Sequence, residues 1–130
     1  MRILIADDSA TARMVVRRCL EIAGCAGAEF TEAKNGVEAL ALTKRDMPDL
    51  VVTDLTMPEM DGARLLEMLQ GDRDTKDIPV LVVTSASNPA KSEELQAKGA
   101  FAVLPKPVQP ADMAEVLEPL LPEDEGGGAW

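Results

Sequence analysis

The sequence lacks histidine altogether, and its apolar runs are short. Without histidine, a zinc site, a serine–histidine or cysteine–histidine nucleophile and a phosphohistidine on this chain are excluded or disfavoured. No apolar run approaches the roughly 20 residues that cross a bilayer. Only four apolar residues separate Arg2 from Asp7, which is too few for the core of a signal peptide. We therefore expect a cytoplasmic protein that does not insert into membranes.

Basic residues are also scarce, with 13 set against 23 acidic residues and a formal net charge of -10. An acidic chain is repelled by phosphate backbones, and the longest basic clusters are the pairs at 17–18 and 44–45. We expect no direct nucleic-acid partner. The two cysteines, Cys19 and Cys25, are able to pair, but two reduced and partly buried thiols are the ordinary state in a cytosolic protein.

The length of 130 residues corresponds to one domain with one core. Continuous apolar runs at 3–6, 50–52, 80–83 and 101–104 are typical of strands that are covered on both faces, as in a parallel sheet. Residues 28–33 alternate more and suit an edge strand. Strands separated by helices imply right-handed crossovers and a parallel sheet with helices on both faces.

Between these runs, apolar residues recur at the i, i+3, i+4, i+7 spacing of amphipathic helices. The helical segments lie at 12–23, 37–41, 65–69 and 113–121. Predicted N-caps are Ser9, Asp61 and Asn88, and predicted stops are Gly24, Gly71 and Gly99.

The weakest helical pattern covers residues 89–98, where only Ala90, Leu95 and Ala97 are available to pack inward. We expect this helix to be the most loosely held. The domain is predicted to span residues 1–121. The remaining residues, 122–130, are acidic and glycine-rich without periodicity, which predicts a disordered tail.

In an open parallel sheet, the ligand site lies beyond the carboxyl ends of the strands. The residues that follow the apolar runs here carry carboxylates, hydroxyls and one ammonium: Asp7 and Asp8, Asp54, Thr84 and Ser85, and Lys106. We expect these groups to converge on one cleft. No basic residue lies near Asp54 in sequence, so the partners of its carboxylate must come from other strands.

This set of groups suits Mg²⁺-dependent phosphoryl transfer. Neighbouring carboxylates repel one another, and a hard divalent cation relieves that repulsion. Two carboxylates then hold the metal while the third attacks phosphorus and forms an acyl phosphate, with a lysine and a hydroxyl sharing the charge on the phosphoryl oxygens. Asp54, central in the sheet and alone on its strand, is the predicted nucleophile.

Each residue also has an ordinary structural interpretation. Asp8 is as well suited to capping the first helix as to binding a metal. Thr84 is compatible with a plain strand position, and Lys106 with a surface charge on a partly buried stem. The joint pattern is stronger than its parts, because several strand ends carry complementary components of one mechanism.

The sequence resembles a known family, the receiver domains of two-component response regulators of the CheY-like, single-domain kind. The resemblance covers residues 1–121 and is carried by ADDS at 6–9, TDLTMPEMDG at 53–62, VVTSAS at 82–87 and KGAFAVLPKP at 98–107. It implies a flavodoxin-like α/β fold, in which a doubly wound, five-stranded parallel sheet of order 2-1-3-4-5 is covered by five helices.

The resemblance also implies the roles of individual residues. Asp54 would be the phosphoacceptor, while Thr84 and Lys106 would bond the phosphoryl group. A cis peptide bond is implied between Lys106 and Pro107. The ligands implied for Mg²⁺ are Asp7, Asp8, Asp54 and the main-chain carbonyl of Thr56.

By the same resemblance, a phosphohistidine of a sensor histidine kinase or phosphotransfer protein donates the phosphoryl group. A conformational change across 89–98, 101–104 and 113–121 would then alter binding of a downstream protein. The chain would be a signalling phosphoacceptor rather than an enzyme, catalysing only its own phosphorylation and dephosphorylation. It would be a monomer or a weak, phosphorylation-dependent dimer.

The expected switch departs from the family pattern. The family usually has a tyrosine or phenylalanine three residues before the lysine, and Val103 stands there in this chain. Phe101 lies two residues earlier and is expected on the same strand face. The predicted switch residues are therefore Thr84, Val103 and Phe101, and whether Phe101 takes the aromatic role stays open.

Other functions remain compatible with the pattern. The phosphoryl group of Asp54 has the chemistry to pass onward to a phosphotransfer protein, as in a phosphorelay shuttle. Because Val103 stands in place of the usual aromatic residue, the sequence is also compatible with a pseudo-receiver, a module that binds partners without being phosphorylated. A phosphatase resembling the haloacid dehalogenase superfamily is disfavoured, because that family needs an acid two residues after the nucleophile and Thr56 stands there.

Overall fold

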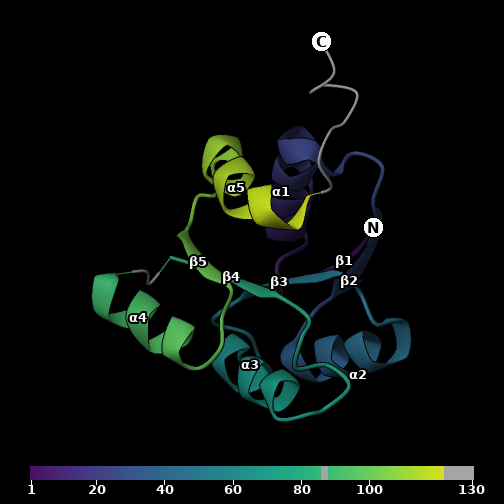
Figure 1. The fold of residues 1–130 in the computed structure, drawn as a ribbon, viewed down its shortest axis with the longest axis vertical. Coiled ribbons are helices and arrows are strands. Elements are labelled where there is room, and N and C mark those ends of the chain that lie inside the picture. The colour runs from purple at the N-terminus through teal and green to yellow at the C-terminus, as the bar shows by residue number, and fades with distance from the viewer. Residues whose placement is uncertain (86–87, 122–130) are drawn as a thin grey trace.

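The computed structural model describes residues 1–85 and 88–121, which form a five-stranded sheet between two layers of helices (Figure 1). The strands are β1 Arg2–Ala6, β2 Glu29–Ala33, β3 Leu50–Asp54, β4 Val80–Thr84 and β5 Ala102–Pro105. The helices are α1 Ala10–Leu20, α2 Gly36–Asp46, α3 Gly62–Gln70, α4 Pro89–Ala97 and α5 Pro110–Leu117. A π-helical turn, Glu21–Cys25, extends α1, and a 3₁₀ turn, Glu118–Leu120, follows α5.

The sheet is parallel throughout and has the order β2-β1-β3-β4-β5, so the predicted fold and strand order are confirmed. The alternating segment at 28–33 is an edge strand as expected. Pro105 ends the opposite edge strand, where its missing N–H interrupts no central ladder. The predicted tail at 122–130 lies outside the described residues.

Both faces of the sheet are covered, which explains why the central strands are continuously apolar. Helices α1 and α5 lie over one face and α2, α3 and α4 over the other (Figure 1). Alternate strand residues point to opposite faces. Ile3 and Ile5 therefore pack with α1 and α5, whereas Leu4 and Ala6 pack with the helices of the other layer.

The helix ends follow the predicted signals. The side chains of Ser9, Asp61 and Asn88 each accept a hydrogen bond from the third residue beyond them, as N-caps do. Gly24 and Gly99 adopt positive φ angles of 121° and 109° that favour glycine.

The cysteines are free and buried, and burial raises the pKa of both thiols.

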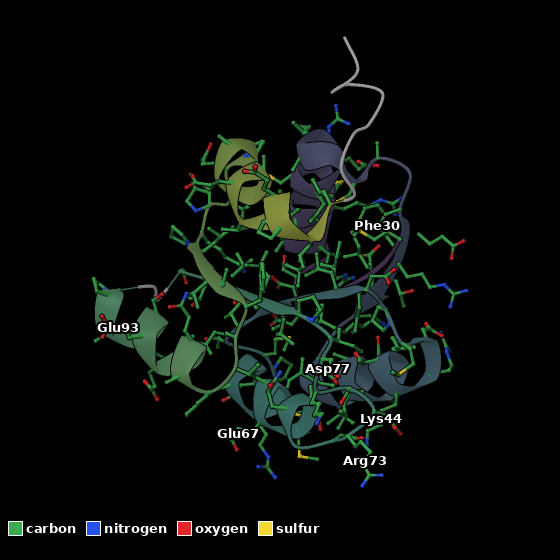
Figure 2. The ribbon with its side chains drawn as sticks, viewed as in Figure 1. Phe30, Lys44, Glu67, Arg73, Asp77 and Glu93 are labelled. Atoms are coloured by element: carbon green, nitrogen blue, oxygen red, sulfur yellow. The ribbon has the colours of Figure 1, made fainter. Side chains whose placement is uncertain are left out.

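Helix α4 buries little of its surface against the rest of the molecule. Leu95 is its single buried residue, and Glu93 lies on its outer side (Figure 2). The expectation that Ala90 and Ala97 pack inward is wrong, because both are exposed. At about 100° per residue, these two alanines lie roughly 140–160° around the helix from Leu95. None of the helices in residues 1–85 and 88–121 combines the length and the apolar character that a membrane-spanning helix requires.

Candidate functional site

Three carboxylates meet at the carboxyl ends of the two central strands. Asp7 follows β1 directly, Asp8 comes next, and Asp54 is the last residue of β3, which pairs with β1. Carboxylate oxygens from all three lie within 4.8 Å of one another. The predicted convergence of these residues is confirmed, and its cause is the parallel register that ends both strands at one edge.

Lys106 supplies the positive charge of this acidic cluster. Its Nζ donates hydrogen bonds to Oδ2 of Asp7 at 2.8 Å and to Oδ2 of Asp54 at 3.1 Å. Partial burial lowers the pKa of Lys106, but the hydrogen bonds and charges of the two carboxylates outweigh it and raise the pKa overall. The ammonium ion therefore joins the last strand to the two central ones.

The cluster fits a hard divalent cation. Asp7 is 3% exposed, and both of its carboxylate oxygens accept hydrogen bonds. Asp8 is exposed, and its carboxylate has no hydrogen-bond or ion-pair partner among the described residues. Close carboxylates with one unengaged member are the donor set that Mg²⁺ takes while keeping several water ligands. The role of the Thr56 carbonyl stays a prediction, although Thr56 lies in the loop that follows Asp54.

That loop is held by two glycines whose function sequence reasoning missed. The N–H of Gly62 donates to the carbonyl of Leu55 at 2.8 Å, and a Cβ at Gly62 would lie 2.2 Å from the main-chain oxygen of Asp54. The N–H of Gly36 donates to the carbonyl of Met60 at 3.0 Å, where a Cβ would again lie at 2.2 Å. The starts of α2 and α3 thus fix the loop after Asp54 by backbone contacts that only glycine permits.

The three predicted switch residues do not share one face. Thr84 is buried at the end of β4, and Val103 packs with the cluster under α3 and α4. Phe101 packs with the opposite cluster, under α1 and α5. The expectation of a common face is wrong, because Phe101 precedes the first residue of β5 and strand alternation does not extend to it.

Lys106 is also tied to the end of β4 through its backbone. Its N–H donates to the carbonyl of Thr84 at 3.1 Å, and the peptide bond between Lys106 and Pro107 is cis, as predicted. Val83 of β4 pairs with Asp54 of β3, so Thr84 lies one residue beyond the level of Asp54 in the sheet. The ends of β3, β4 and β5 therefore meet beside the acidic cluster.

A further charged residue at this site, Arg13, was not singled out from the sequence. It belongs to α1, and its guanidinium contacts both the main-chain oxygen of Asp7 and the carboxylate of Glu32 on β2. Its position one helical turn after the Ser9 cap was the available signal, because that spacing directs a side chain back toward the start of the helix.

Comparison with known proteins gives consistent results. Residues 3–118 match the family described as response regulator receiver domain. A chemotaxis protein CheY homolog of Campylobacter jejuni is 32% identical, the alignment covering 99% of this chain and 98% of the relative. The chemotaxis protein CheY-3 of Vibrio cholerae is 35% identical over 91% of this chain and 89% of its own. The solved structure of the chemotaxis response regulator CheY4 of Vibrio cholerae is similar with a TM-score of 0.80, at 32% identity, over 92% of this chain and 98% of that one.

Proposed function

We propose that this chain, which belongs to the response regulator receiver family, accepts a phosphoryl group on Asp54 from a phosphohistidine of a sensor kinase or phosphotransfer protein. The observation that carries the proposal is the cluster of Asp7, Asp8 and Asp54 within 4.8 Å, with the ammonium of Lys106 bonded to two of the three carboxylates. The chain is then a signalling phosphoacceptor that acts on other proteins and catalyses only its own phosphorylation and dephosphorylation.

In the proposed transfer, a carboxylate oxygen of Asp54 forms a bond to phosphorus as the phosphorus–nitrogen bond of the donor breaks. The electron pair of that bond goes to the imidazole nitrogen, and Asp54 becomes an acyl phosphate. Lys106 stays charged and turns from the carboxylates to the phosphoryl oxygens, with the hydroxyl of Thr84 as a second donor. Mg²⁺ bound by Asp7, Asp8, Asp54 and the Thr56 carbonyl would neutralise charge on the transferring oxygens.

The signal is proposed to pass to the surface formed by α4, β5 and α5. Lys106 lies directly after β5, and its backbone is bonded to the end of β4, so movement of its side chain acts on both strands. Leu95 is the single buried residue of helix α4, so little free energy is needed to change the position of the helix. New phosphoryl contacts worth a few kcal/mol are able to shift such a marginal element.

The donor protein is proposed to dock in an apolar groove beside Lys106. The groove has a volume of about 390 Å³ and is lined by Ala12, Val15 and Val16 of α1 and by Ser85, Lys106, Pro107 and Val108. Val15 is 44% exposed although it is apolar. Because Lys106, which contacts Asp54, is one of the residues that line the groove, a helix carrying a phosphohistidine would lie near the phosphoacceptor when it fills this groove.

Intact-mass measurement tests the phosphoacceptor directly. The wild type and Asp54→Asn are incubated with acetyl phosphate, with and without Mg²⁺. The expected result is one base-labile phosphate that requires Mg²⁺ and is missing from Asp54→Asn. The matched control Asp77→Asn removes an exposed carboxylate of the loop before β4 and should be phosphorylated normally (Figure 2). A wild type that gains no phosphate under any condition would instead favour a phosphorylation-independent binding module.

The donor groove is tested by comparing two kinds of donor. Val15→Glu should slow transfer from a phosphohistidine protein and leave phosphorylation by acetyl phosphate unchanged, because only the protein fills the groove. Val37→Glu, at a residue of α2 that is 50% exposed, is the matched control. Equal effects of the two variants would exclude the groove. A phosphoryl group that passes from Asp54 to an added phosphotransfer protein would favour the shuttle.

A further inference from the structure

We propose that Arg13 is a positioning residue that fixes the turn carrying Asp7 and Asp8, so that the two carboxylates are preset for Mg²⁺. The inference rests on the proposed function, because it concerns the metal that supports phosphorylation of Asp54. It assigns a role to a cationic side chain that contacts the backbone of the acidic cluster, at Asp7, rather than one of the carboxylates.

The guanidinium of Arg13 joins three elements. From α1, Nη1 donates to the main-chain oxygen of Asp7 at 2.7 Å, and Nε donates to Oε1 of Glu32 on β2 at 2.7 Å. The side chain of Arg13 is only 12% exposed, while that of Glu32 is 43% exposed. A guanidinium offers N–H groups in several fixed directions, so one residue holds the end of β1 and the neighbouring strand together.

With the contact from Arg13, the N–H, the carbonyl oxygen and both carboxylate oxygens of Asp7 each have a hydrogen-bond partner. The N–H of Asp7 donates to the carbonyl of Ala33, its Oδ1 accepts from the N–H of Ser9, and its Oδ2 accepts from Lys106. Arg13 takes the remaining group, the main-chain oxygen. That carbonyl belongs to the peptide unit that leads to Asp8, whose side chain has no partner of its own among the described residues. The backbone that Arg13 holds therefore sets the direction of the Cα–Cβ bond of Asp8, from which its carboxylate reaches the cluster.

Charge and position predict opposite effects of Arg13 on metal binding. A cation beside the cluster repels Mg²⁺, so an arginine acting only through its charge would weaken binding, and its removal would tighten binding. An arginine that holds the ligands in place strengthens binding, and its removal would weaken it. Glu32 reduces the repulsion by pairing with the guanidinium, which leaves the positioning effect dominant.

The experiment measures Mg²⁺ affinity by isothermal titration calorimetry and the free energy of unfolding by urea, for the wild type and Arg13→Gln, Arg13→Lys and Arg18→Gln. Arg18→Gln is the matched control, because it removes the same charge from an α1 residue that is 72% exposed and does not contact Asp7. We expect Arg13→Gln to weaken Mg²⁺ binding by about 10-fold or more, as loss of a group that orients metal ligands does. Arg13→Lys should also weaken it, because one ammonium does not reproduce the two contacts. The control should bind like the wild type.

Two results would overturn the inference. Arg13→Gln binding Mg²⁺ as tightly as the wild type or more tightly would show that the arginine does not preset the ligands. Lower stability to urea with unchanged Mg²⁺ affinity would assign Arg13 a purely structural role. A wild type that binds Mg²⁺ but takes no phosphate from acetyl phosphate would contradict the proposed function and leave the positioning role intact.

Discussion

Replacing Asp8 with asparagine should make the metal-free protein more stable than the wild type. With Mg²⁺ present, the variant should be the less stable of the two. Asp8 lies within 4.8 Å of two other carboxylates and has no partner among the described residues. At that separation, each repulsion costs about 1 kcal/mol at the dielectric constant of water and about 3 kcal/mol at an effective value of 20. Lys106, whose Nζ bonds both of the other carboxylates, offsets part of this repulsion. Because Asp8 is exposed, the lower figure applies, and Asp8→Asn should gain about 1 kcal/mol.

The assay is thermal and urea unfolding with and without Mg²⁺. A gain of about 1 kcal/mol corresponds to an increase of roughly 4 °C in Tm for a chain of this size. Mg²⁺ at 100 times its Kd stabilises the wild type by about 2.7 kcal/mol. If the variant binds 10-fold to 100-fold more weakly, as loss of a ligand predicts, the same Mg²⁺ concentration adds only about 0.4–1.4 kcal/mol. The wild type then becomes the more stable protein.

The control separates this local effect from the overall charge. Asp77→Asn makes the same change in net charge at the amino-terminal side of β4, away from the strand ends that carry the site. It should shift the stability little, and equally with and without Mg²⁺. Asp8→Asn that gains no stability over this control, or that responds to Mg²⁺ as the wild type does, would refute the reasoning.

Three further predictions follow from contacts and burial. Gly62→Ala should destabilise the protein by about 2–3 kcal/mol in urea unfolding and impair phosphorylation, because its Cβ would lie 2.2 Å from the carbonyl oxygen of Asp54; Gly27→Ala, with nothing within 4 Å, should do neither. Because the pKa of Lys106 is raised in the folded protein, the charged lysine contributes stability that is fully present below the ordinary lysine pKa and is lost as the pH rises through the folded-state pKa. Lys106→Met should abolish this part of the loss of folding stability at alkaline pH. The two buried thiols, with raised pKa values, should react with a thiol reagent only slowly until the protein is unfolded, and fast reaction of the folded protein would contradict their burial.

Patterns in the sequence predicted the strands, the helices and much of the site because these depend on short-range features, whereas the strand order came from the family resemblance. Continuous apolar runs marked strands that are covered on both faces, and cap residues such as Ser9 and Asp61 marked helix starts. Asp7 and Asp54 were recognised because they directly follow such runs, and parallel strands end at one edge. These features are local in sequence, so a single chain is enough to find them.

The side on which Phe101 packs was not predictable from spacing, because it depends on where β5 begins. The exposure of Ala90 and Ala97 likewise depended on how α4 is oriented on the sheet. The roles of Gly36 and Gly62 arise from contacts with the backbone of other elements, which leave no pattern in the sequence. For Arg13 the sequence offered only its spacing of one helical turn from Ser9, which does not reveal the contact with the backbone of Asp7.

Residue type and strand periodicity are therefore enough to tell which chemical groups this protein has and at which end of the sheet they lie. Lys106 was predicted to partner Asp54, but only the tertiary structure shows that it also bonds Asp7 and that Arg13 holds the backbone of Asp7. The physical reason is that these hydrogen bonds form over about 3 Å, whereas sequence patterns fix only the strand that carries a residue and the face to which it points.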